Sequence, residues 1–291
     1  MERNRGHIAT EQRHSSTTEL DALSTLDCVE LLATDHIDAV RAVQSASTSI
    51  ASFIDEVANR KGRLIYIGCG TSGRLGVLDA AECPPTFQAD SEKVIGIIAG
   101  GNTSLRTSSE AKEDAFEGAH EELNKLGLTE QDVVLGIAAG GTTPWVHGGL
   151  SLAKDKGAFT AFLTCVEVPC ACDHVIQLDT GPEPLTGSTR LKAGTATKLT
   201  LNIITTTYFT KIGKVYGNYM VDLKATNDKL MDRGIRIIEA LCKISREDAR
   251  ELLIVSNKEV KTAIVMHHKS VTREEALNLI DEAGGHLRQL L

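Results

Sequence analysis

A glycine-rich turn, "GCGTSGR" over residues 68–74, follows a short apolar run and carries the first residues that could do chemistry. A turn that leads from a strand into a helix offers free backbone N–H groups and the positive end of the helix dipole, which together bind phosphate. Two hydroxyls and a guanidinium in the same turn favour a site for one phosphate group over a turn that merely needs glycine. The residues predicted to bind phosphate are Gly70, Thr71, Ser72, Gly73 and Arg74.

The glycine spacing also occurs in turns that bind the pyrophosphate of NAD. In that case an acidic residue closes the second strand and holds the ribose. Here the second predicted strand, residues 93–100, ends in glycines, and Asp90 precedes it. NAD is therefore a less favoured ligand than a single phosphate.

Two acidic clusters follow the turn and could supply a general acid and a general base. On the helix predicted for residues 73–83, Asp79 and Glu82 are three residues apart and share a face. Glu82 lies roughly 15 Å of helical rise beyond the turn. It can reach a phosphate site only if the pocket folds back over the helix or if it faces the cleft of a partner chain.

The second cluster, "EAKED", contains Glu110, Glu113 and Asp114 on the helix predicted for residues 108–126. Such acids are more often solvated surface than catalytic groups. Two carboxylates beside one phosphate site would allow one to accept a proton and the other to donate one. The spacing alone does not decide between these interpretations.

A third polar region spans residues 180–198 around a predicted helix start. Hydroxyl and basic side chains at a helix N-terminus indicate anion or sugar binding, and the alternative is a heavily capped helix. Its polar residues are Glu183, Thr186, Ser188, Thr189, Arg190, Lys192, Thr195 and Lys198.

These residues must be positioned by an alternation of strands and helices. Short apolar runs typical of parallel strands buried on both faces lie at residues 63–68, 93–100, 132–139, 158–164 and 174–179. Helical segments are predicted at 73–83, 108–126, 144–156 and 191–213. The pattern predicts an α/β fold with a doubly wound, mostly parallel sheet.

The two ends of the chain differ from this middle part. The first 20 residues are polar and predict an arm, followed by a helical pattern from residue 35 to Gly62. "SREDARELLI" and "TREEALNLID" repeat each other, each with a capping-box pattern, and predict a small all-helical, UBA-like subdomain. The predicted domains are therefore 1–60, 61–234 and 235–291.

Composition excludes several classes of partner. The net charge of −8, the 4% aromatic content and the absence of a dense basic run disfavour nucleic acid. No apolar stretch predicts a membrane span or a signal peptide. Seven cysteines, an odd number, predict reduced thiols in the cytoplasm rather than a disulfide framework. "CACDH" lacks the second ligand pair of a structural zinc site, so no metal is expected.

Together these stretches resemble the N-acetylmuramic acid 6-phosphate etherase family over nearly the whole chain. The matching motifs include "IYIGCGTSGRLGVLDAAECPPTF", "DTGPEPLTGSTRLKAGTATK" and "GKVYGNYMVDLKATNDKL". Glucokinase regulatory proteins, which share the sugar isomerase (SIS) fold, are more distantly similar. The resemblance implies a cytoplasmic homodimer that cleaves the lactyl ether of its substrate to give N-acetylglucosamine 6-phosphate and D-lactate.

The resemblance also implies roles for the two acidic clusters. Glu82 matches the family's proton donor and Glu113 its second catalytic acid, which replaces the surface interpretation of the second cluster. The reaction needs no cofactor, because an aldehyde at C1 of the opened sugar acidifies the proton at C2 and stores the charge as an enolate.

The chain departs from the family at one loop. The third predicted strand runs into Gly140, Gly141, Thr142, Thr143 and Pro144, where the family has Ser-Gly-Arg-Thr-Pro. We expect this loop to line the sugar phosphate site, with Thr142 or Thr143 replacing the missing hydroxyl. A non-catalytic sugar phosphate-binding regulator and a sugar phosphate isomerase stay open as alternatives.

Overall fold

The computed structural model describes residues 5–108 and 112–291. Within these ranges no helix is both long enough and apolar enough to cross a membrane. Contacts divide the chain into two compact units, Met1–Ala81 with Glu92–Ile204 and Glu82–Ser91 with Thr205–Leu291.

The first unit is built on a parallel sheet, which confirms the predicted fold class. Its strands are β1 (Leu64–Gly68), β2 (Val94–Ile98), β3 (Val133–Ile137), β4 (Phe159–Thr164) and β5 (His174–Gln177), in the order β2-β1-β3-β4-β5. β1 and β3 are buried along their whole length, as expected for central strands covered on both faces.

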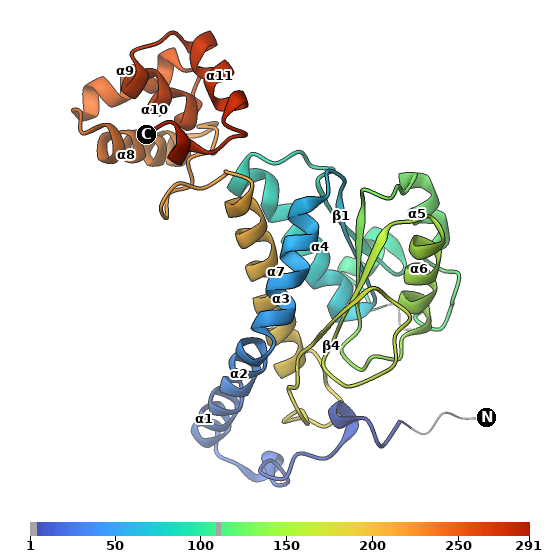
Figure 1. Cartoon of the computed structure of the whole chain (residues 1–291). Coiled ribbons are helices and arrows are strands. Elements are labelled where there is room, and N and C mark those ends of the chain that lie inside the picture. The colour runs from blue at the N-terminus through green and yellow to red at the C-terminus, as the bar shows by residue number, and fades with distance from the viewer. Residues whose placement is uncertain (1–4, 109–111) are drawn as a thin grey trace. The chain divides into compact units, whose positions relative to one another are not determined.

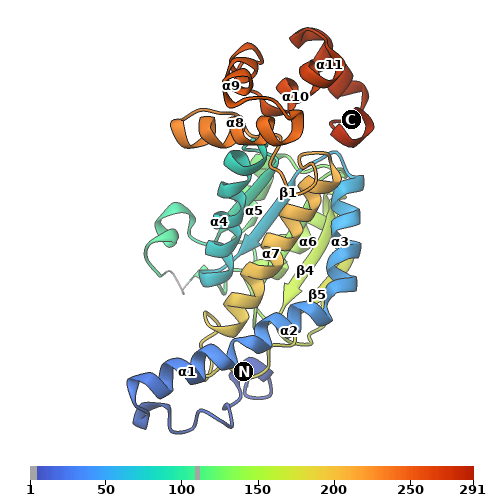
Figure 2. The same ribbon diagram turned by 90° about the vertical axis from the view of Figure 1, so that its left-hand side faces the viewer.

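Helices cover both faces of this sheet (Figures 1 and 2). On one face, α5 (His120–Leu126) and α6 (Pro144–Asp155) pack against the side chains of Ile65, Val134 and Phe162. On the other lie α3 (Ser47–Asn59), α4 (Gly70–Phe87) and α7 (Lys192–Lys211). α1 (Thr25–Asp35) and α2 (Ile37–Ser45) precede α3.

Two helices of the structure begin or end at other residues than the sequence predicts. α4 begins at Gly70 and runs through Pro84 and Pro85 to Phe87, because prolines this close to a helix end remove only hydrogen bonds of the last turn. The helix predicted over 108–126 is wrong over residues 113–119, where the chain forms turns that include Glu113 and Asp114, and α5 begins only at His120. A 3₁₀ helix, Gly101–Leu105, precedes this range. Glu110 lies outside the described residues.

The second unit contains α8 (Asp228–Cys242), α9 (Arg246–Val255), α10 (Val260–Lys269) and α11 (Arg273–Glu282). The helical repeat is confirmed: Ser245 caps α9 through the amide of Asp248, and Thr272 forms a complete capping box with Glu275 at α11. The helices enclose a core of apolar residues from α8, α9 and α10, among them Ile238, Leu253 and Ile264.

Candidate active site

A cavity of about 290 Å³ lies where the chain leaves β1 and β3. The strand order reverses between these two strands, and ligands of open α/β sheets bind outside the carboxyl ends of the strands at such a point. The residues that line it are Arg5, Ile8, Glu11, Cys69, Gly70, Thr71, Ser72, Arg74, Ser108, Glu113, Ile137, Ala138, Ala139, Gly140, Thr142, Thr143 and Thr189.

The predicted phosphate turn forms the first turn of α4. Gly70 takes a left-handed conformation (φ 51°) at the start of the helix, and Thr71 and Ser72 follow it into the cavity wall. The free backbone amides of this first turn can bind an anion. Gly73 lies behind the wall, because a Cβ there would come within 2.5 Å of the carbonyl oxygen of Gly68. Gly73 therefore lets α4 pack closely on β1.

Arg74 lies at the edge of the same cavity. Its guanidinium donates to the carbonyl oxygen of Leu105, with Nε at 3.3 Å, and to that of Thr107, with Nη2 at 3.5 Å. Arg74 thus ties the phosphate turn to the segment after β2. That segment also contributes Ser108 and Glu113 to the cavity.

Glu113 is the predicted catalytic acid that lines the cavity. Its Oε1 lies 3.6 Å from the point that a Cβ on Gly70 would occupy. Its backbone carbonyl accepts from the amide of Trp145 at 3.0 Å, which fixes the turn against the start of α6. Burial and the neighbouring charge of Glu113 raise the pKa of Cys69 to about 12, so this thiol is neutral in the site.

Glu82, the other predicted catalytic acid, is exposed on α4 and is not among the residues that line this cavity. It lies ten residues beyond Ser72, a rise of roughly 15 Å along the helix. Its side-chain neighbour one turn earlier, Asp79, is buried and holds Lys198 Nζ at 3.0 Å.

The polar region at 180–198 mostly fixes the start of α7. Glu183 is fully buried, and its two oxygens accept from the amides of Lys192 and Ala193 at 2.8 and 2.9 Å. Burial raises the pKa of Glu183 even though these amides favour the charged form. Of this region only Thr189 lines the cavity, and Ser188 and Arg190 do not.

Lys192 is also buried and joins three segments. Its Nζ lies 3.1 Å from Oδ1 of Asp35, and the same oxygen lies 3.0 Å from Nε2 of His14. The ion pair therefore holds the start of α7 to α1 and to the N-terminal arm. Lys192 has a partner inside the protein, and it does not line the cavity.

The loop after β3 lies where the sequence predicts it, with Gly140, Thr142 and Thr143 in the cavity wall. A Cβ on Gly140 would have only the Thr10 hydroxyl oxygen near it, at 3.9 Å. That hydroxyl is buried and has no hydrogen-bond partner among the residues that the structure describes. A polar atom without a described partner thus lies behind the cavity wall, close to the position where the family carries a serine.

The sequence did not predict the contribution of the N-terminal arm. Arg5, Ile8 and Glu11 line the cavity. One signal for this existed, namely the apolar residue Ile8 in an otherwise polar stretch, which the structure buries. Among the described residues, no cluster of three or more histidine, cysteine or acidic side chains could hold a metal ion.

The chain is similar to known proteins over most of its length. A family model described as the N-terminal SIS domain of glucokinase regulatory protein matches residues 46–154, and one described as its C-terminal lid domain matches residues 217–275. N-acetylmuramic acid 6-phosphate etherase of Crocosphaera subtropica is 50% identical over 99% of this chain and 96% of its own. The etherase of a Nostoc species is 50% identical over 98% and 95%.

Proposed function

Because this chain belongs to the N-acetylmuramic acid 6-phosphate etherase family, we propose that it cleaves the D-lactyl ether of N-acetylmuramic acid 6-phosphate to N-acetylglucosamine 6-phosphate and D-lactate. The observation that carries the proposal is a cavity that joins a helix-start phosphate turn to the carboxylate of Glu113. The direct test mixes the purified protein with the substrate and measures D-lactate.

The reaction proceeds through the open-chain sugar, whose C1 aldehyde acidifies the proton at C2. Glu113 removes this proton, and the electron pair is held as an enolate. The C2–C3 double bond then forms as the C3–O bond breaks, and a proton from an acid neutralises the departing lactate oxygen. Water adds at C3, so that one water is consumed for each lactate released. Positioned acids and bases contribute about 10²–10⁴-fold each to such steps.

We assign the proton donor to Glu82 of a second copy in a homodimer. Two observations support this: Glu82 lies roughly 15 Å of helical rise beyond the phosphate turn along α4, and α1 buries none of its residues. Exposed apolar side chains on α1 and α2 offer a dimer surface: Leu26, Val29, Ile37 and Val40.

Mixing inactive Glu82→Gln and Glu113→Gln proteins tests the shared site. Each mixed dimer would contain one site with both acids, so about a quarter of the wild-type activity should return after subunit exchange. If the mixture stays inactive while a mixed dimer is detected by mass spectrometry, both acids belong to one chain.

Binding without catalysis is the second candidate function. The observation that favours it is the loop of Gly140 and Thr142, which lacks the hydroxyl and the guanidinium found in the family. Retention of both Glu82 and Glu113 favours the enzyme, because binding alone needs no acid–base pair. Sugar phosphate binding without release of D-lactate would support the regulator, and exchange at C2 without release would support an isomerase.

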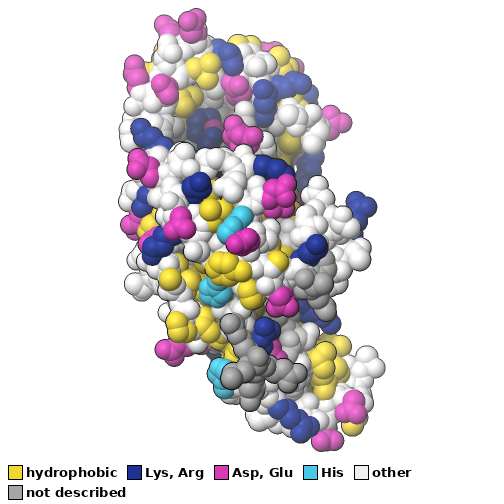
Figure 3. Space-filling view, turned by 90° about the vertical axis from the view of Figure 1, so that its right-hand side faces the viewer, with side chains coloured by type: hydrophobic (Ala, Val, Ile, Leu, Met, Phe, Trp, Pro, Cys, Tyr) yellow, Lys and Arg dark blue, Asp and Glu magenta, His cyan; other side chains and the backbone are white. Residues whose placement is uncertain are grey.

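We place the protein in the cytoplasm, with a small anionic sugar as its ligand. All seven cysteines are free thiols, which suits a reducing compartment. On the face drawn in Figure 3, acidic and basic side chains are interspersed and form no broad basic surface. A nucleic acid partner would need such a surface.

A further inference from the structure

A second cavity, of about 480 Å³, adjoins the first. Arg5, Ile8 and Thr142 line both, so the two spaces share a wall. The first cavity, at about 290 Å³, is at the small end of small-molecule sites, which span about 300–1,000 Å³. A sugar phosphate therefore leaves little room there for a further substituent.

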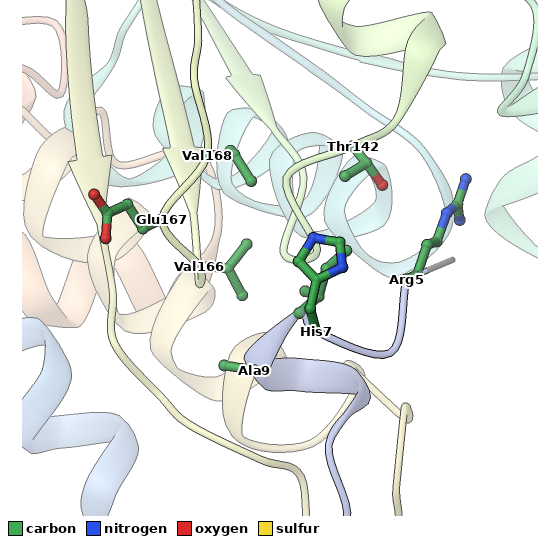
Figure 4. A pocket seen from close by; sticks show the side chains of 8 residues that line it. Arg5, His7, Ala9, Thr142, Val166, Glu167 and Val168 are labelled. Carbon is green, nitrogen blue, oxygen red and sulfur yellow. The ribbon is translucent and has the colours of Figure 1, made fainter. Parts of the chain in front are cut away.

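The second cavity has one polar side and one apolar side. Figure 4 shows Arg5, His7 and Thr142 on one side and Val166 and Val168 on the other. Arg5 brings a guanidinium, His7 an imidazole and Thr142 a hydroxyl, all of which can donate to a carboxylate.

Among the described residues, Glu167 supplies the carboxylate that lines this cavity. Figure 4 shows this carboxylate directed away from Arg5 and His7. In the part of the chain that the structure describes, the guanidinium of Arg5 makes no ion pair. A short anionic ligand with an apolar face would fit this environment, since a guanidinium and a carboxylate form strong charge-assisted hydrogen bonds.

We propose that the second cavity binds the lactyl group of the substrate, with its carboxylate on Arg5, His7 and Thr142 and its methyl group against Val166 and Val168. This inference rests on the proposed function, which supplies a substrate with both a phosphate and a lactyl ether. The N-terminal arm thereby distinguishes the substrate from its product, which has lost the lactyl group.

Two ligands separate this role from phosphate binding: N-acetylmuramic acid 6-phosphate, and N-acetylglucosamine 6-phosphate, which lacks the lactyl group. In Arg5→Gln, KM for the first should rise about tenfold or more, the loss expected for one charge-assisted hydrogen bond. The inhibition constant of the second should change by less than about twofold. Arg13→Gln is the matched control, since Arg13 lies on the same arm, donates to the carbonyl oxygen of Thr18 and lines neither cavity.

His7→Glu tests the second cavity alone, because His7 lines only this cavity and is exposed, so the change leaves the core intact. The new carboxylate should repel the lactyl carboxylate and weaken binding of the first ligand only. Ser15→Glu adds the same charge to the arm at an exposed position that lines neither cavity, and should change the affinity for neither ligand.

Calorimetry with both ligands, with Glu113→Gln as the common background so that the substrate is not cleaved, keeps the two proposals distinguishable. If the wild type releases no D-lactate, the etherase function fails, while the difference in affinity between the ligands still reports on the cavity. If Arg5→Gln weakens both ligands equally, Arg5 binds the phosphate and the lactyl assignment is wrong. If neither Arg5→Gln nor His7→Glu changes the affinity for the lactyl-bearing ligand, the second cavity does not contact it.

Discussion

Oε1 of Glu113 lies 3.6 Å from the point that a Cβ on Gly70 would occupy, although the two residues follow different strands of the sheet. This relationship places a carboxylate beside the backbone amides that begin α4. A sugar phosphate held by those amides would therefore have its ring close to the proposed base.

Ser72→Ala should weaken sugar phosphate binding. A hydrogen bond to a charged group is worth about 1.5–3 kcal/mol, so affinity should fall roughly tenfold or more in a calorimetric titration. Ser245→Ala is the control, because it removes the cap of α9 in the second unit. That change should lower stability by about 1 kcal/mol and leave affinity unchanged. Equal affinity of wild type and Ser72→Ala would remove this hydroxyl from the site.

Glu113→Gln should abolish both D-lactate release and exchange of solvent deuterium into C2, because no enolate can form without the base. Each rate should fall by about 10²–10⁴-fold. NMR of substrate recovered from deuterium oxide measures exchange, and an enzymatic D-lactate assay measures release.

Glu82→Gln should reduce release far more than exchange. The enolate can still form and be reprotonated at C2 when the leaving group receives no proton. Loss of exchange in Glu82→Gln with retention in Glu113→Gln would reverse the two roles. Full activity in both variants would remove both acids from the mechanism.

Restoring the family's loop with Gly140→Ser and Thr142→Arg should lower KM for the substrate. The structure has room for the serine, since a Cβ on Gly140 meets only the Thr10 hydroxyl, at 3.9 Å, and this hydroxyl has no hydrogen-bond partner within residues 5–108 and 112–291. Testing the two changes separately matters, because Thr142 also borders the second cavity. A KM that stays level or rises in Gly140→Ser means that Thr142 and Thr143 already supply the needed contacts.

Asp132→Asn should destabilise the first unit at neutral pH. Burial alone would raise the pKa of Asp132, but hydrogen bonds from Arg63 and Thr129 outweigh it and hold the pKa at about 2. Because this folded-state value lies below the ordinary value of 3.8, the carboxylate stabilises the fold above about pH 4 by roughly 2 kcal/mol.

That stabilisation should disappear as the pH falls from about 4 to about 2, and roughly half of it should be lost at pH 3. Urea unfolding at pH 7, 5 and 3 measures the difference between the variant and the wild type. Asp38→Asn is the control, since Asp38 pairs with Arg41 on the surface, where ion pairs contribute about 0–1 kcal/mol. A difference between Asp132→Asn and wild type that stays constant over this pH range would contradict the assignment.

The sheet could be predicted from the sequence because a strand buried on both faces requires an uninterrupted run of apolar residues. The runs before Gly68 and after Asp132 are apolar without alternation, and each became a central strand. The turn after β1 could also be predicted, since two of its positions require glycine. Gly70 takes a positive φ and Gly73 permits close packing.

Other features depend on contacts between segments far apart in the sequence, so the local sequence pattern does not predict them. The chain around Glu113 forms turns that pack on Trp145: the carbonyl oxygen of Glu113 accepts from the Trp145 amide, and a Cβ on Gly118 would come within 2.4 Å of the Trp145 ring. The polar side chains of Glu183 and Lys192 suggested ligand binding. In the structure Glu183 caps the start of α7 and Lys192 pairs with Asp35. The sequence cannot distinguish these structural roles from ligand binding, because the same residue types serve both. The arm's part in the site depends on packing against segments far along the chain, and the apolar, buried Ile8 is its one sign in the sequence.

The cavity is complete only when the N-terminal arm is folded against it, so the site forms through a local folding step of this arm. Backbone hydrogen bonds of the arm, such as those from Ile8 to Arg5 and from Gln12 to Ala9, close within the arm itself. Segments held mainly by side chains open at a lower free energy than the core strands of a sheet. Each opening would remove Arg5, Ile8 and Glu11 from the cavity walls at once, while the sheet and the phosphate turn stay folded. Occupancy by a ligand that contacts the arm shifts this equilibrium by mass action, so the arm's protection from proteases and from hydrogen exchange would report how full the site is.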